Sequence, residues 1–142
     1  MGKAVDRFIS EKDEEGIRSS FGVPKYYSTD YGNVLVVEKV HLPKEYNINC
    51  VNIAIKVIYG YNGQALFDMF WTFPYIGFLD KEIGVFPKNS ILCDLKLKDV
   101  IWQRWSRHYD PDQYTPCTAL QHISWSYHQI EREAELWLNF RK

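Results

Sequence analysis

The chain has few cysteines, and their spacing excludes the usual roles of that residue. Its 142 residues contain Cys50, Cys93 and Cys117, an odd number with no CxxC or CxxH spacing. Neither a disulfide framework nor a zinc site is expected from such a pattern. Reduced thiols of this kind are typical of a cytoplasmic protein. We assign no metal and no cofactor.

Long apolar runs and an excess of basic charge are also missing. No uninterrupted apolar stretch approaches the ~20 residues that a membrane helix needs, and the opening MGKAVDRFISEKDEE lacks the apolar core of a signal peptide. The formal net charge of -1 argues against a nucleic-acid-binding protein with a broad basic surface. The sequence therefore predicts a cytoplasmic protein that binds neither membranes nor nucleic acids.

Aromatic residues are what the chain has in excess. They make up 16% of the sequence, with five Trp and ten Tyr, and both types recur in cores and at protein interfaces. Protein partners are the expectation that follows. The length and the 46% hydrophobic content fit one domain over residues 1–142, in which residues 1–30 form an N-terminal helix and a lead-in.

Apolar patterns predict a strand meander in the first two thirds of the chain. The turn signal Gly32-Asn33 precedes the first strand, and the alternation in residues 50–59 indicates a sheet covered on one face. The predicted strands are 34–37, 50–59, 65–73 and 91–100. Residues 75–89 have no clean period and predict an irregular flap.

Two helices complete the prediction. Val5, Phe8 and Ile9 fit a short helix before the acidic run 11–15. A long C-terminal helix is indicated by a cap at Thr115, by Pro116 in the first turn, and by apolar residues at helical spacing. Those residues are Leu120, Ile123, Tyr127, Ile130, Ala134, Trp137 and Leu138. The order of elements is that of an α+β domain.

The segment WQRWSRH, residues 102–108, carries the strongest hint of chemistry and is predicted to be a loop. Ser106 lies two residues from His108, and a neighbouring imidazole acting as general base is the usual way to activate a hydroxyl. The alternative is structural, because aromatic residues can anchor a core while Ser and His cap a turn.

Several motifs together resemble the prokaryotic family E of ubiquitin-conjugating (E2-like) proteins. They are the Leu42-Pro43 step, an alternating strand, DMFW at residues 68–71, WQRWSRH, and the aromatic-x-Pro step Tyr109-Asp110-Pro111 before a helix. The match runs from about Val34 to the C-terminus. It implies a UBC-like fold with an N-terminal helix, a four-stranded antiparallel meander, a flap leading to an active-site loop, and a C-terminal helix.

The resemblance also implies a function. Such proteins accept the C-terminal carboxyl of a ubiquitin-like protein from an adenylating, ThiF-like activating enzyme and pass it to an acceptor. Bacterial members resemble parts of small conjugation systems that include a processing peptidase, with antiviral defence as a suggested setting. An inert UBC-fold adaptor, which binds the activating enzyme or the ubiquitin-like protein without a covalent bond, is the alternative.

The sequence departs from the eukaryotic pattern at the nucleophile. No His-Pro-Asn step is present, and residues 95–108, where the cysteine belongs, contain none. Ser106 with His108 is the first replacement and predicts an oxyester, although His108 can also serve a nucleophile held elsewhere. Cys93 is the second candidate, beside two lysines but in an apparent strand, and Cys117 is the third, in the first turn of the predicted helix, where amide dipoles stabilise a thiolate.

The remaining residues of the motifs have supporting roles in this hypothesis. Arg104 and Arg107 stabilise the developing oxyanion, grip carboxylates of a partner, or are solvated loop charges. Trp102 and Trp105 are expected to support the site structurally. Asp68 orients His108 or an arginine, or caps a strand end.

Overall fold

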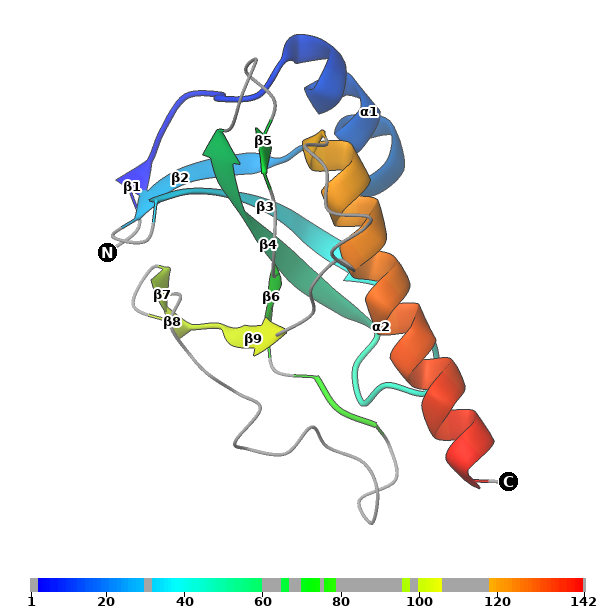
Figure 1. Ribbon diagram of the computed structural model, residues 1–142. Helices are drawn as coiled ribbons and strands as arrows, with labels where there is room; N and C mark the ends of the chain where they lie inside the picture. The colour runs from blue at the N-terminus through cyan, green and yellow to red at the C-terminus, as the bar shows by residue number, and fades with distance from the viewer. Residues whose placement is uncertain are drawn as a thin grey trace.

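The computed structural model describes residues 3–29, 32–59, 65–66, 70–74, 76–78, 96–97, 100–105 and 118–141. These residues form an α+β structure in which two helices accompany an antiparallel sheet (Figure 1). The helices are α1 (Glu11–Phe21) and α2 (Ala119–Arg141). The strands are β1 (Lys3–Ala4), β2 (Lys25–Thr29), β3 (Gly32–His41), β4 (Cys50–Tyr59), β5 (Ala65–Leu66), β6 (Phe70–Phe73), β7 (Lys96–Leu97), β8 (Val100–Ile101) and β9 (Gln103–Trp105).

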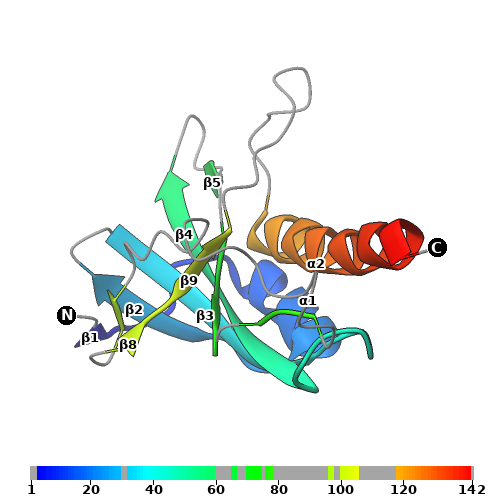
Figure 2. The same ribbon diagram turned by 90° about the horizontal axis from the view of Figure 1, so that it is seen from below.

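The strands of the main sheet follow the order β1-β2-β3-β4-β6-β9, and β5 pairs with β4 beside this path. The described sheet differs from the expected four-stranded meander, because β1 and β2 precede β3, β9 follows β6, and β7 pairs only with β8 in a separate two-stranded sheet. Both helices lie on the same face of the sheet (Figure 2). Within the described ranges, neither helix combines the length and apolarity that crossing a membrane requires.

The predicted strands agree with the structure to different degrees. Residues 50–59 form β4 as predicted, because Val, Ile and Lys alternate there between a buried and a more polar face. The strand predicted at 34–37 is longer, since the Gly32-Asn33 step lies inside β3 and pairs with β2, a strand that the sequence analysis missed. The single strand predicted at 91–100 is wrong, because β7 and β8 pair with each other as a hairpin.

The prediction of a sheet covered on one face is wrong, because the sheet buries apolar residues on both faces. On the helix-covered face, Leu35, Val37, Ile53 and Ile55 join residues of both helices in the larger core. The opposite face carries a second cluster of buried residues: Tyr27, Val34, Val36, Ala54, Trp71 and Trp102. A sheet buried on both faces explains why residues 34–37 read as a continuous apolar run rather than an alternating one.

Helix α1 starts later than predicted. Ser10 is its N-cap, with a side-chain oxygen that accepts a hydrogen bond from the amide of Asp13 at 3.1 Å. The acidic run 11–15 therefore lies inside the helix, where negative charge in the first turn suits the helix dipole. The prediction of a short helix around Val5 to Ile9 is wrong. The cap at Ser10 determines where the helix starts, and the apolar pattern before it is weak. The helix ends before Gly22, whose φ of 101° suits glycine.

Helix α2 also begins at an unexpected cap. The amide of Thr118 donates to Gln121 Oε1 at 2.8 Å, and the amide of Gln121 donates to Thr118 Oγ1 at 3.1 Å. This reciprocal pair is a capping box. The prediction that Thr115 caps the helix and that Pro116 lies in its first turn is wrong, since the described helix starts only at Ala119.

Candidate active site

The structure brings the two most specific motifs of the sequence side by side. Residues 103–105 of WQRWSRH form strand β9 rather than the predicted loop, and β9 pairs with β6, which contains the last two residues of DMFW. Phe70 lies opposite Trp105, and Trp71 lies opposite Arg104. Strand β9 is the last of the main sheet in the described residues, so the chain reaches Ser106 directly from a sheet edge.

The two tryptophans of WQRWSRH anchor this edge on opposite faces. Trp105 stacks on Phe70 in the larger core, with ring centroids 5.0 Å apart. Trp102 belongs to the second cluster and lies 5.7 Å from the ring of Phe73. Their exposed fractions are only 3% and 6%. Both rings are buried on either side of the strand that leads to Ser106.

A buried hydrogen-bond network fixes the same edge. Thr72 Oγ1 donates to Gln103 Oε1 at 3.2 Å and accepts from Trp105 Nε1 at 3.0 Å. The Gln103 amide also bonds the backbone of Ile76, accepting from its N–H at 2.9 Å and donating to its carbonyl at 3.3 Å. Gln103 and Thr72 are buried, so these bonds satisfy groups that water does not reach. The network links β6, β9 and the chain after Pro74.

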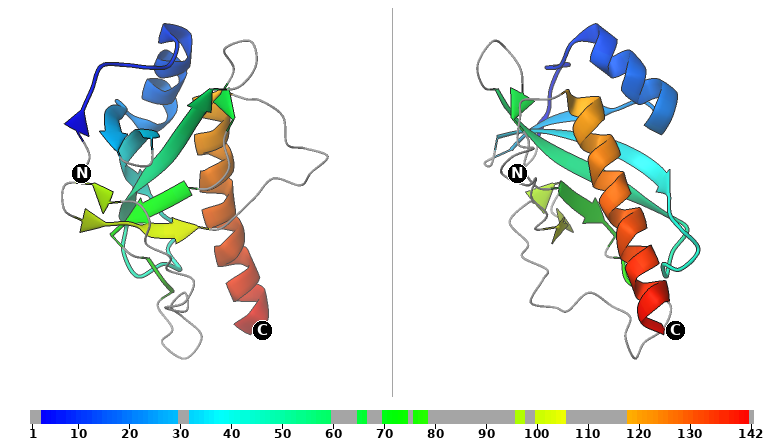
Figure 3. Two further views of the ribbon diagram at one scale, coloured as in Figure 1. Left: turned by 60° about the vertical axis from the view of Figure 1, so that its left-hand side comes forward. Right: turned by 45° about the vertical axis from the view of Figure 1, so that its right-hand side comes forward.

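The start of α2 is fixed by a residue of α1. Asp13 Oδ2 accepts from the Ala119 amide at 2.8 Å, and Asp13 Oδ1 accepts from the Leu120 amide at 3.0 Å. Gly16 lies one turn further along α1, where an added Cβ would stand 2.6 Å from the end of the Leu120 side chain, which would have to shift. Figure 3 shows α1 beside the first turns of α2.

The start of α2 corrects the position predicted for Cys117. The residue lies before the cap of α2 and not in its first turn. The amides of residues 118 to 121 already donate to Gln121, Asp13 and Thr118. The first-turn position predicted for Cys117 is therefore wrong, and Cys117 itself lies outside the described residues.

Several predicted site residues fall outside the described residues. These are Asp68, Cys93, Ser106, Arg107, His108 and Cys117. Arg104 is described and half-buried, and by strand alternation it lies on the face opposite to Gln103 and Trp105. The sequence did not single out three residues that help to determine the site: Asp13, Gly16 and Thr72. Only the Thr118-x-x-Gln121 spacing carried a readable signal, that of a capping box.

Cys50 is the one cysteine that the described residues include, and it is remote from this edge. Ile55 of β4 lies opposite Phe70, which in turn lies opposite Trp105. Cys50 is five residues earlier in β4, about 17 Å along the strand at the usual rise, and two strands across. Its half-buried thiol cannot reach a group at the end of β9.

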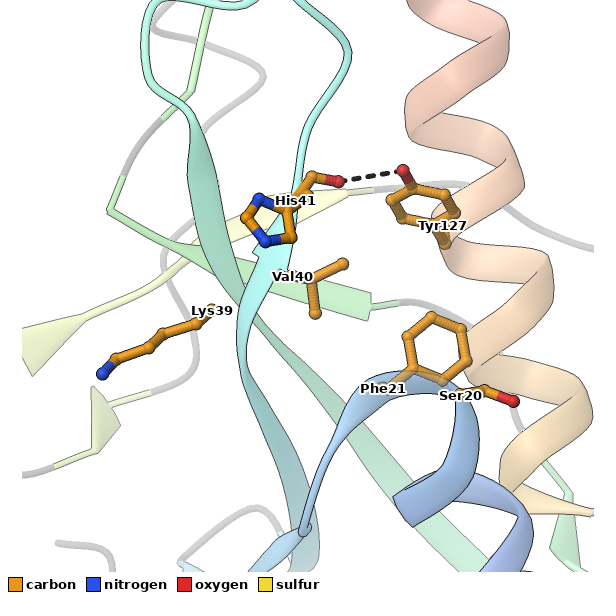
Figure 4. A pocket seen from close by; sticks show the side chains of 6 residues that line it. All are labelled: Ser20, Phe21, Lys39, Val40, His41 and Tyr127. Atoms are coloured by element: carbon orange, nitrogen blue, oxygen red, sulfur yellow. Dashed lines mark hydrogen bonds between the residues drawn. The ribbon is translucent and has the colours of Figure 1, made fainter.

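A pocket of about 270 Å³ lies elsewhere, between the end of α1, the end of β3 and the middle of α2 (Figure 4). Phe21 and Tyr127 meet edge to face with centroids 6.2 Å apart, and the Tyr127 hydroxyl donates to the His41 carbonyl at 2.9 Å. Burial, followed by the nearby charge of Glu131, raises the pKa of Tyr127. The Lys39 side chain extends away from these rings, so the pocket presents an aromatic wall without an aimed charge.

No metal centre is seen in the part of the chain that the structure describes, where no three His, Cys, Asp or Glu side chains gather. His122 and His128 lie on different faces of α2, because residues six positions apart do not share a helix face. His122 is buried and stacks on Trp125 with centroids 5.4 Å apart, whereas His128 is exposed and lies 3.9 Å from Glu131.

Comparison with known proteins identifies the family. The family model described as prokaryotic E2 family E matches residues 12–136, which includes most of both helices, the β6–β9 edge and the Asp13 contact. No curated protein and no solved structure matches the chain. E2 proteins act in ubiquitin-like conjugation, and their partners are a ubiquitin-like protein and its activating enzyme. The chain belongs to prokaryotic E2 family E.

Proposed function

We propose that this protein is a conjugating enzyme that carries a ubiquitin-like protein as an oxyester on Ser106. In this step the Ser106 hydroxyl passes its proton to His108, and its oxygen bonds the C-terminal carbonyl carbon of the ubiquitin-like protein. The bond between that carbon and the activating enzyme breaks, and the leaving group takes up the proton. A later attack by an acceptor group releases Ser106 again.

The observation that carries this proposal is the position of Ser106 in the chain. It follows Trp105, the buried last residue of β9, whose ring and indole nitrogen are both fixed. A nucleophile next to a rigid strand end loses little freedom when it reacts, which favours attack. Cys50 is too distant to replace it.

The other motif residues have defined roles in the proposal. His108 is the general base, while Arg107 and Arg104 offer positive charge to the oxyanion or to carboxylates of the partner. Asp68 orients His108 or an arginine. The proposed partners are a ubiquitin-like protein, an adenylating, ThiF-like activating enzyme and a processing peptidase of the same cytoplasmic pathway.

Mass spectrometry tests the proposal directly. The protein is mixed with its activating enzyme, nucleotide and ubiquitin-like protein, and the adduct is treated with base or with thiol reductant. We expect an adduct that base cleaves and thiol does not. It survives when Cys50, Cys93 and Cys117 are all changed to Ala, and it is absent from Ser106→Ala.

Two other outcomes would contradict the oxyester. An adduct that thiol reductant cleaves moves the nucleophile to Cys93 or Cys117, and single Cys→Ala variants then tell these two apart. A stable complex in gel filtration without an adduct under any nucleotide condition identifies the adaptor instead. His108→Gln separates the general base from the nucleophile, because it slows adduct formation without changing the base lability of the adduct that does form.

A further inference from the structure

Residues 106–117 join two described positions that are each held by contacts from distant parts of the chain. At Trp105 the contacts are the stack on Phe70 and the bond to Thr72. At the start of α2 they are the two bonds from Ala119 and Leu120 to Asp13, which is more than 100 residues away in sequence. The first anchor belongs to the sheet, whereas the second belongs to α1.

The second anchor depends on one carboxylate. Both oxygens of Asp13 are engaged, each by a different amide of the first turn of α2. A carboxylate in this place also meets the positive end of the helix dipole, so the contact is stronger than a neutral cap. The bonds between Thr118 and Gln121 satisfy two further amides, and both stay within the start of α2. Asp13 is therefore the described side chain that ties the start of α2 to α1.

The sequence of α1 is arranged around this contact. Asp13, Gly16 and Ile17 share one face of the helix by their spacing, and Ile17 is fully buried. Glycine inside a helix costs about 1 kcal/mol relative to alanine. Here the space taken by Leu120 accounts for it, since a Cβ on Gly16 would stand too close. Glycine thus leaves room for the Leu120 side chain beside the Asp13 contact.

We propose that Asp13 is a positioning residue for conjugation, because its bidentate cap fixes where residues 106–117 enter α2. This inference rests on the proposed function of Ser106. Asp13 itself takes no part in the acyl transfer. It acts through the backbone of Ala119 and Leu120, at the far end of the segment that contains both Ser106 and His108.

Single-turnover kinetics of adduct formation test this role. The variants are Asp13→Ala, which removes both acceptors, and Asp13→Asn, which keeps one. Glu11→Gln is the matched control, because Glu11 is an exposed acidic residue of the same first turn and removing it changes the charge of α1 equally. Rates are measured over a range of activating-enzyme concentrations up to saturation and well below the melting temperature of each variant.

We expect Asp13→Ala to lower the rate by about ten- to hundredfold, as loss of positioning does, with Asp13→Asn in between and Glu11→Gln within about twofold of wild type. The concentration of activating enzyme that gives half the maximal rate stays unchanged. Hydrogen exchange at the Ala119 and Leu120 amides should quicken in Asp13→Ala and not in Glu11→Gln.

The possible failures are distinguishable. If wild-type protein forms no adduct, the proposed function fails and the role of Asp13 fails with it. If wild type and Asp13→Ala react at the same rate while Ser106→Ala does not react, only the positioning role is overturned. A rate loss that merely follows the unfolded fraction of Asp13→Ala, as read by circular dichroism, shows a structural residue and also overturns it.

Discussion

Thr72 offers a sharp test of how the β6–β9 edge is held. Its hydroxyl is fully buried and stands between two side chains, since it donates to Gln103 Oε1 and accepts from Trp105 Nε1. Valine has nearly the same shape and no hydroxyl, so Thr72→Val removes both bonds without opening a cavity. The substitution therefore isolates the polar contribution of this position.

The expected cost follows from what each partner loses. Gln103 Oε1 keeps its bond from the Ile76 amide at 2.9 Å, so it remains satisfied. Trp105 Nε1 loses its bond to Thr72, and a buried donor without its partner costs about 1–3 kcal/mol. For a chain of this length each kcal/mol lowers the melting temperature by about 3–4 °C. We expect Thr72→Val to melt about 3–12 °C below wild type.

Thermal and urea unfolding followed by circular dichroism measure this change. Thr29→Val is the control. The Thr29 hydroxyl also donates a hydrogen bond, to the Gly32 carbonyl at 2.9 Å, but this bond is exposed to solvent. Water can replace that bond, so the control should lose less than about 0.5 kcal/mol. Thr72→Ser keeps the hydroxyl and should retain the bond to Trp105.

A double-mutant cycle with Trp105→Phe completes the test. Phenylalanine keeps an aromatic ring against Phe70 but has no N–H, so Thr72→Val then leaves no donor unsatisfied. The double variant should lose less free energy of unfolding than the two single variants lose in sum, by about 1–2 kcal/mol. Strict additivity, or a Thr72→Val cost no greater than that of Thr29→Val, would show that this network does not hold the edge.

Three further predictions concern the caps, the pH dependence and the backbone. Thr118→Ala should destabilise the protein by about 0.5–2 kcal/mol in urea unfolding, whereas Thr115→Ala should change its stability by less than about 0.5 kcal/mol, because Thr118 is the cap of α2. Burial and a hydrogen bond to Glu14 raise the pKa of Tyr26 above its usual value near 10. The unfolded chain therefore loses this proton first as pH rises, so stability should fall above about pH 10, and less steeply in Tyr26→Phe. Lys39 has a φ of 56° at the bulge between Val37 and Val40, so Lys39→Gly should be neutral or stabilising by up to about 1 kcal/mol, while Lys39→Val should be clearly destabilising.

The elements that the sequence predicted best are those whose signal is local. The alternation in residues 50–59 fixed β4, and the apolar spacing from Leu120 to Ala134 indicated α2. The starts of the helices were harder to predict, because polar residues near Ser10 and Thr118 are also possible caps. The local pattern favoured a helix start at Thr115 and Pro116. The cap is instead Thr118, which exchanges two hydrogen bonds with Gln121 three positions further on.

The candidate site was predictable in its motifs and not in its contacts. WQRWSRH stood out by its residue types, but nothing in the sequence says that Trp102 and Trp105 enter different cores. The pairing of β9 with β6 joins residues about 30 positions apart, and the bonds of Asp13 to α2 join residues more than 100 apart. Such contacts depend on the tertiary fold, which periodicity and propensity do not encode.

The pairing of β6 with β9 places residues of DMFW directly beside residues of WQRWSRH. Phe70 needs Trp105 as its stacking partner, and Thr72 needs Gln103 and Trp105 to satisfy its hydroxyl. These residues form one packing unit, so a change in one strand is felt in the other. The chemistry that we propose lies beyond this unit, at Ser106. A Ser106→Ala protein should therefore unfold like wild type and yet form no oxyester, which separates the scaffold of the motif from its function.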